Sequence, residues 1–139
     1  MNDDARDLLE PYKLLFLTAA KVDRMLPPVQ RRLVKSFWPD IKPEWLAYGQ
    51  ETTEVTLQAN SKQISLYDLA IDLSLRIADD ADRRLLWGCV FSAIDNRGRE
   101  KHRGIAWSYV GRKTGLHRHT VQRQFWDILR KVALLDAER

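Results

Sequence analysis

The stretch from residue 105 to residue 132 constrains the fold of this chain more than any other. Apolar residues repeat at helical spacing on both sides of two glycines, Gly111 and Gly115. Two helices that pack at a steep angle need a small residue where their backbones approach, and we expect Gly111 to be that residue. Gly115 supplies the left-handed backbone that a tight turn requires. The apolar positions expected to point inward are Val110, Leu116, Val121, Phe125, Ile128 and Leu129.

The second predicted helix has a polar and basic outward face, which begins at His117. Arginine can bind guanine with two hydrogen bonds, and glutamine can bind adenine in the same way. The pattern predicts a helix-turn-helix that places its second helix in the major groove of double-stranded DNA. The alternative is an ordinary helical hairpin with a solvated charged face. Base reading is expected from Arg118, His119, Gln122, Arg123 and Trp126, and phosphate binding from Arg103, Arg112, Lys113, Arg130 and Lys131.

Positive charge is concentrated on this part of the chain. Residues 97–131 hold ten Lys or Arg and two acidic residues, whereas the chain as a whole has a net charge of +4. The remaining residues are therefore net acidic. Segregated positive charge favours a nucleic-acid partner, because each neutralised phosphate releases condensed counterions.

Two resemblances accompany these motifs. The segment from Leu85 to Val132 resembles sigma region 4, the part of bacterial sigma factors that reads the −35 promoter element, and the related response-regulator and phage modules. Residues 120–125 (TVQRQF) are similar to the start of the recognition helix in extracytoplasmic-function sigma factors, and residues 82–87 (DRRLLW) resemble the start of the helix before the motif. The loop from Asn96 to Gly104 is longer and more basic than in those factors, and His117 stands where they have a small capping residue.

The chain also resembles a family of small uncharacterised helix-turn-helix proteins from phages and prophages of alphaproteobacteria. The residues that carry this likeness are Trp38-Pro39 and the segment from Trp45 to Gly49. This resemblance covers most of the chain and implies a phage or prophage origin, but it brings no established function.

The rest of the chain predicts an all-α fold, a multi-helix bundle with a C-terminal helix-turn-helix. Helical periods run over 12–26, 28–38, 43–49, 65–77 and 84–94, with Ser65 expected to cap the fourth of these. The polar stretch 50–63 separates an N-terminal helical extension, 1–50, from a helix-turn-helix DNA-binding domain, 64–139. The extension would serve in dimerisation or partner docking, or pack within the core. The basic loop 96–104 either reaches the DNA or is a mobile solvated loop.

Other classes of function have weaker support in the sequence. We expect no catalytic site, metal or cofactor, because no constellation with the required spacing occurs; His117 and His119, two apart on a helix, face different ways. The single cysteine, Cys89, is expected to be a buried thiol. No membrane span or signal peptide is expected, so the predicted location is the bacterial cytoplasm.

The sequence thus favours a sequence-specific DNA-binding protein, a phage or prophage-type transcriptional regulator. It does not give the oligomeric state, for which a homodimer is one alternative. A second hypothesis is an adaptor that binds RNA polymerase or a sigma factor. A third is a DNA-packaging protein of the small-terminase type.

Overall fold

The structure is a computed structural model that describes residues 3–26 and 61–139. Its helices are α1 (Asp3–Met25), α5 (Ser61–Leu75), α6 (Asp80–Ser92), α7 (Trp107–Thr114) and α8 (Arg118–Ala137). These residues form helices and loops, with one isolated antiparallel bridge between Ile94 and Glu100. The all-α prediction is confirmed for this part of the chain. The helices expected over 28–38 and 43–49, with their tryptophan motifs and the boundary near residue 50, lie outside the described residues.

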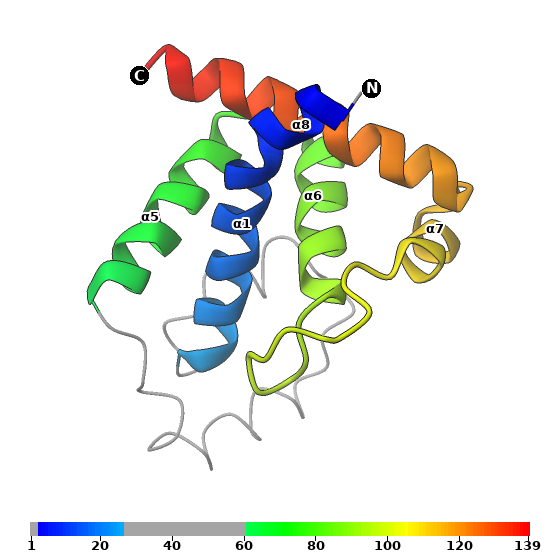
Figure 1. Ribbon diagram of the computed structural model, residues 1–139, viewed down its shortest axis with the longest axis horizontal. Coiled ribbons are helices and arrows are strands. Elements are labelled where there is room, and N and C mark those ends of the chain that lie inside the picture. The colour runs from blue at the N-terminus through cyan, green and yellow to red at the C-terminus, as the bar shows by residue number, and fades with distance from the viewer. Residues whose placement is uncertain (1–2, 27–60) are drawn as a thin grey trace.

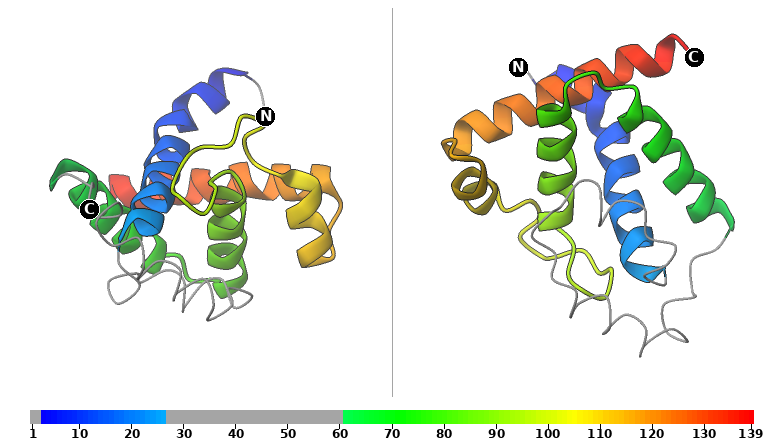
Figure 2. Two further views of the ribbon diagram at one scale, coloured as in Figure 1. Left: turned by 90° about the horizontal axis from the view of Figure 1, so that it is seen from below. Right: turned by 180° about the vertical axis from the view of Figure 1, so that it is seen from behind.

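Helices α1, α5 and α6 stand side by side, and α8 crosses one end of all three (Figures 1 and 2). The second half of α8 lies over α1 and α5. Its first half extends beyond α6 and contacts α7, which follows the loop at the far end of α6. The arrangement holds the start of α8 at one edge of the molecule.

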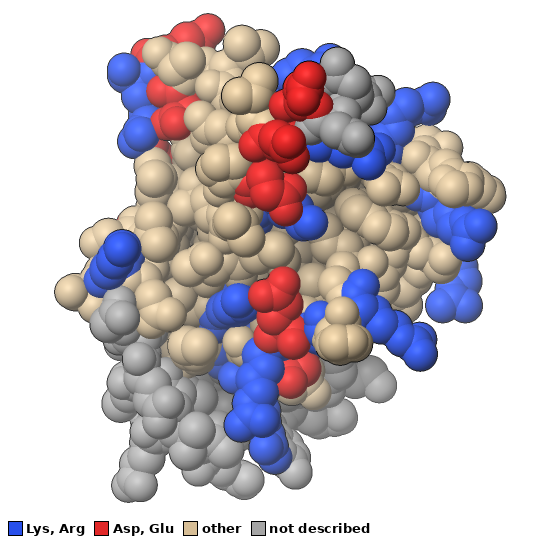
Figure 3. Space-filling view, viewed as in Figure 1, with Lys and Arg blue, Asp and Glu red and all other residues tan. Residues whose placement is uncertain are grey.

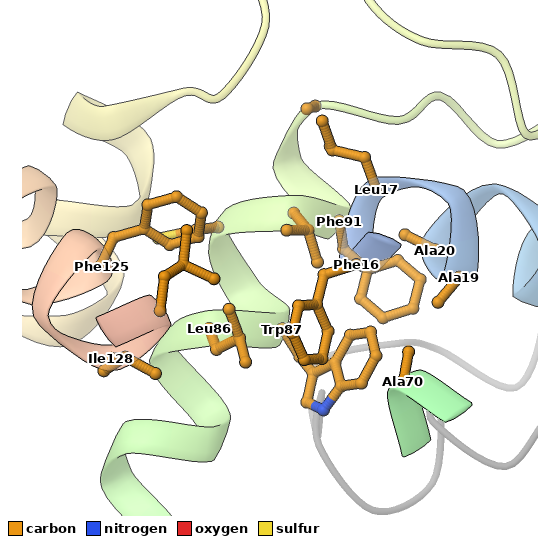
Figure 4. Packing of buried hydrophobic residues seen from close by; sticks show 14 of the residues in the cluster. Phe16, Leu17, Ala19, Ala20, Ala70, Leu86, Trp87, Phe91, Phe125 and Ile128 are labelled. Carbon is orange, nitrogen blue, oxygen red and sulfur yellow. The ribbon is translucent and has the colours of Figure 1, made fainter. Parts of the chain in front are cut away.

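One continuous hydrophobic core joins these helices (Figure 4). Trp87 of α6 lies at its centre and is fully buried, with the Phe16 ring of α1 edge-on to it at 5.2 Å between centroids. Toward α7 the core continues through Phe125, whose ring lies 5.4 Å from that of Trp107. Burial of side chains this large is the main stabilising term in such a fold.

Helix α1 is an integral part of this core. Its buried Asp23 carboxylate accepts a 2.8 Å hydrogen bond from the hydroxyl of Tyr67 on α5. Near the middle of α1, Tyr12 donates a 2.8 Å hydrogen bond to Asp136 near the end of α8. The extension expected at the N-terminus therefore packs, over the residues described, within the same core as the C-terminal helices. Docking by residues 1–50 to a partner stays a prediction.

Two helix starts differ from the sequence-based expectation. Helix α1 begins at Asp3 and continues through Pro11, ahead of the apolar period that is visible from residue 12. Of the two alternatives for residues 1–9, a frayed end or the acidic start of a helix, the second describes residues 3–9. Helix α5 begins at Ser61, so the prediction that Ser65 caps it is wrong. The Ser65 hydroxyl lies inside the helix and donates to the backbone oxygen of Ser61 at 3.0 Å. In both cases the helix begins before the window in which its apolar period is visible, and most of the residues added there are exposed.

The basic loop between α6 and α7 is held against the end of α1. Its Asp95 carboxylate accepts hydrogen bonds from the backbone N–H groups of Arg97 and Arg99, both at 2.9 Å. Burial raises the pKa of Asp95, but these hydrogen bonds outweigh it and lower the pKa overall. Lys21 of α1 pairs with Glu100 at 3.0 Å. These contacts anchor the loop at Asp95 and Glu100; its reach to DNA and the alternative of a mobile solvated loop both stay predictions.

Candidate nucleic-acid interface

The turn between α7 and α8 has the backbone geometry that its glycines predicted. Gly115 ends α7 with a left-handed φ of 76°. A Cβ placed on Gly111 would lie 2.5 Å from the backbone oxygen of Leu116, a distance that real Cβ atoms do not adopt. Both predictions are confirmed: Gly111 allows the close approach of the two backbones, and Gly115 allows the turn.

His117 is the N-cap of α8, in the position where a Ser, Thr, Asn or Asp is more usual. Its Nδ1 accepts a hydrogen bond from the backbone N–H of His119 at 3.2 Å. The two imidazole rings lie 5.1 Å apart, so the expectation that they face different ways is wrong, because His117 precedes the helix. Acceptance by Nδ1 requires that this nitrogen be unprotonated. The cap thus orders the exposed first turn of α8.

The exposed side chains of this edge are mainly basic (Figure 3). Arg118, His119 and Arg123 are exposed on the first half of α8, and Gln122 is half-buried between them. The predicted phosphate ligands Arg103, Arg112, Lys113 and Arg130 are also exposed.

The arginines of this edge differ from the cations of α1, α5 and α6 in their ion pairing. Five cations on α1 and α6, or directly after α5, each form an ion pair with a carboxylate: Lys13, Lys21, Arg76, Arg83 and Arg84. Within residues 3–26 and 61–139, the structure shows no ion pair for the arginines at the α7–α8 edge. These unpaired residues are Arg103, Arg112, Arg118, Arg123 and Arg130.

Two predicted site residues lie elsewhere. Trp126 was expected to face outward, but only 7% of it is exposed, because the first turns of α1 cover it. Arg6 and Lys13 of α1 each place their charge 5.8 Å from the centroid of its ring. The prediction that Trp126 lies on the outer face is wrong, and its buried position gives no support to a role in reading bases.

Lys131 is the second of these residues. It pairs with Asp82 of α6 at 3.0 Å, and the hydrogen bond and charge of that carboxylate raise the pKa of the Lys131 ammonium. The structure therefore does not bring Lys131 together with the other expected phosphate ligands, although its side chain remains largely exposed.

A hollow of about 390 Å³ lies between α1 and α8. The sequence analysis missed the contribution of α1, because nothing in residues 1–9 indicates contact with a helix more than a hundred residues later. The hollow is lined by Arg6 of α1 and by His119, Gln122, Arg123, Trp126, Asp127 and Arg130 of α8.

The described residues show little that suggests chemistry. Cys89 is buried as predicted, and burial raises the pKa of its thiol well above the usual range. No cluster of three His, Cys, Asp or Glu in this part of the chain is placed to hold a metal ion. None of the helices described is long and apolar enough to cross a membrane.

No protein-family model matches the chain, and comparisons with curated proteins and with solved structures found no significant match.

Proposed function

We propose that this chain is a sequence-specific double-stranded DNA-binding protein, a transcriptional regulator of the phage or prophage type. In this proposal α7, the Gly115 turn and α8 act as a helix-turn-helix, with α8 as the recognition helix. Arg118, His119, Gln122 and Arg123 read base edges from its first half. Arg103, Arg112, Lys113 and Arg130 bind phosphates on either side.

The observation that carries this proposal is the set of unpaired, exposed arginines along one edge. An arginine in a folded protein commonly meets a carboxylate, as Arg83 and Arg84 do on Asp80. The arginines around α7 and the first half of α8 have no such partner among the residues described, and the carboxylates lie mainly elsewhere. Guanidinium groups that are free of carboxylate partners can bind the phosphates of a duplex.

The shape of the edge supports the same function. The first half of α8 extends beyond α6, so its outer face is open to a groove while its inner face packs through Val121 and Phe125. The residues near the start of a recognition helix are the ones that contact bases in helix-turn-helix proteins. Gly111 and Gly115 fix the position of this helix relative to α7.

The test starts with selection of bound fragments from a pool of duplexes at two salt concentrations, with competitor DNA present. Retention of particular sequences at the higher salt would identify a cognate site. At that site Arg123→Ala should cost about 1–3 kcal/mol of binding free energy. Arg76→Ala removes the same charge from an ion-paired position directly after α5 and should leave the affinity nearly unchanged. Unchanged specific binding by the Arg123 variant would refute the proposed role of α8.

A protein-binding adaptor is the second candidate, and one observation favours it. Leu8 and Leu14 of α1 are 77% and 55% exposed, although both are large and apolar. Such side chains are common at contacts with other proteins. Binding to DNA that fades uniformly with salt, together with retention on RNA polymerase or a sigma factor, would favour the adaptor over the regulator.

A further inference from the structure

The hollow between α1 and α8 brings together cations from opposite ends of the chain. Arg6 comes from the first turns of α1, and Arg123 and Arg130 come from α8. The ring of Trp126 contributes to the lining, and the Arg6 guanidinium carbon lies 5.8 Å from its centroid. Asp127 is the single carboxylate in the lining. Three guanidinium groups therefore share the hollow with one carboxylate.

These three arginines make no ion pair within the part of the chain that the structure describes. Like charges that line one hollow repel one another, and a bound anion would remove that repulsion. A guanidinium group presents two parallel N–H donors that match the oxygens of a phosphate. The partly aromatic lining favours arginine further, since guanidinium groups stack on indole rings.

The position of the hollow along α8 indicates which phosphate it would hold. Arg130 lies seven residues beyond Arg123, which is about 10 Å along a helix. Bases are read near the start of a recognition helix, so groups two turns farther on meet the backbone at the edge of the groove. Arg6 adds a second cation at this place from another helix.

We propose that Arg6 and Arg130 together bind one phosphate of the DNA backbone, so that the N-terminal helix α1 forms part of the DNA interface. This inference rests on the proposed DNA-binding function. The contact between Tyr12 and Asp136 holds α1 on α8 before DNA arrives. The two cations are thus positioned in advance, which lowers the entropic cost of binding. The phosphate of a free nucleotide has the same chemistry, and the experiment separates the two sources.

The test measures the affinity of a labelled duplex by fluorescence anisotropy over a range of sodium chloride concentrations. Each phosphate contact contributes about one to the slope of the logarithm of affinity against the logarithm of salt. Arg6→Gln should lower this slope by about one and weaken cognate and unrelated duplexes by the same factor. Arg6→Lys keeps the charge and should restore most of the slope. Lys62→Gln is the matched control, because Lys62 lies at the start of α5, far from α8.

A parallel titration with inorganic phosphate follows the indole N–H resonance of Trp126 by NMR. A change in this resonance at millimolar phosphate in the wild type, lost in Arg6→Gln, supports a phosphate site that also accepts small phosphates. If the wild type binds duplexes and Arg6→Gln keeps the slope of Lys62→Gln, the inference fails while the proposed function stands. If the wild type binds no duplex, the proposed function fails, and the contact of Arg6 with a DNA phosphate fails with it. The phosphate titration then shows whether Arg6 belongs to a site for small phosphates, which the shift would support and its absence would refute.

Discussion

Replacement of Gly111 by alanine tests whether the close approach of α7 and α8 depends on the absence of a side chain. The new Cβ would lie 2.5 Å from the backbone oxygen of Leu116 and 3.5 Å from the backbone nitrogen of Arg118. The first distance is roughly 1 Å short of ordinary van der Waals contact. Because the oxygen belongs to the backbone of the turn, it cannot rotate away, and the turn itself must move.

The two opposing effects of this substitution can be compared. Overpacking that shifts a backbone costs about 1–3 kcal/mol, and the rigid partner places Gly111→Ala in the upper half of that range. Alanine favours the helix over glycine by up to about 1 kcal/mol. We therefore expect a net loss of about 1–2 kcal/mol in the free energy of unfolding, and weaker DNA binding because the position of α8 changes.

Urea denaturation followed by tryptophan fluorescence measures the first quantity. Ser108→Ala is the control, since Ser108 is exposed on the same helix and the substitution raises helix propensity without filling a contact. The control should be neutral or slightly stabilising. A Gly111→Ala protein that is as stable as the wild type, or more stable, would show that the approach of the two backbones does not require glycine.

Two further predictions concern the ends of α8. Tyr12→Phe removes the hydrogen bond to Asp136 and should cost about 0.5–1.5 kcal/mol at neutral pH. That hydrogen bond, burial and the Asp136 charge raise the pKa of Tyr12, so the folded state keeps the proton more tightly than the unfolded state. The stabilisation is then complete below the ordinary tyrosine pKa of 10.0 and declines as the pH rises above it, and denaturation curves at pH 8 and pH 11 should show the wild type losing its advantage over Tyr12→Phe. His117→Asp should stabilise α8 by roughly 0.5–1 kcal/mol through a stronger cap and a favourable dipole interaction, yet weaken DNA binding by placing a carboxylate at the interface; stability and affinity that change in the same direction would contradict it.

Much of the C-terminal region could be predicted from residues that act locally. Gly111 and Gly115 lie four positions apart between two apolar periods, and a tight turn between helices satisfies both constraints. The buried position of Cys89 followed from its apolar neighbours on α6. The same local logic placed Val121, Phe125 and Leu129 in the core.

Contacts between distant segments account for the failures. Trp126 occupies the predicted helical position, but α1 lies over it, and the helical period of α8 contains no information about α1. Lys131 follows Arg130 directly, yet its ammonium reaches Asp82, which is 49 residues away in sequence. The sequence analysis gave Arg6 no role in binding, because no motif in the neighbouring residues indicates a contact with α8.

The sequence by itself determined the class of the fold, the turn between α7 and α8, and the concentration of positive charge near that turn. These depend on backbone conformation, helical period and composition, which act over a few residues. Only the tertiary structure decided which of those charges remain unpaired and that α1 reaches the basic edge. Ion pairing and coverage depend on distances between side chains from separate helices, and such distances arise only when the hydrophobic core brings the helices together.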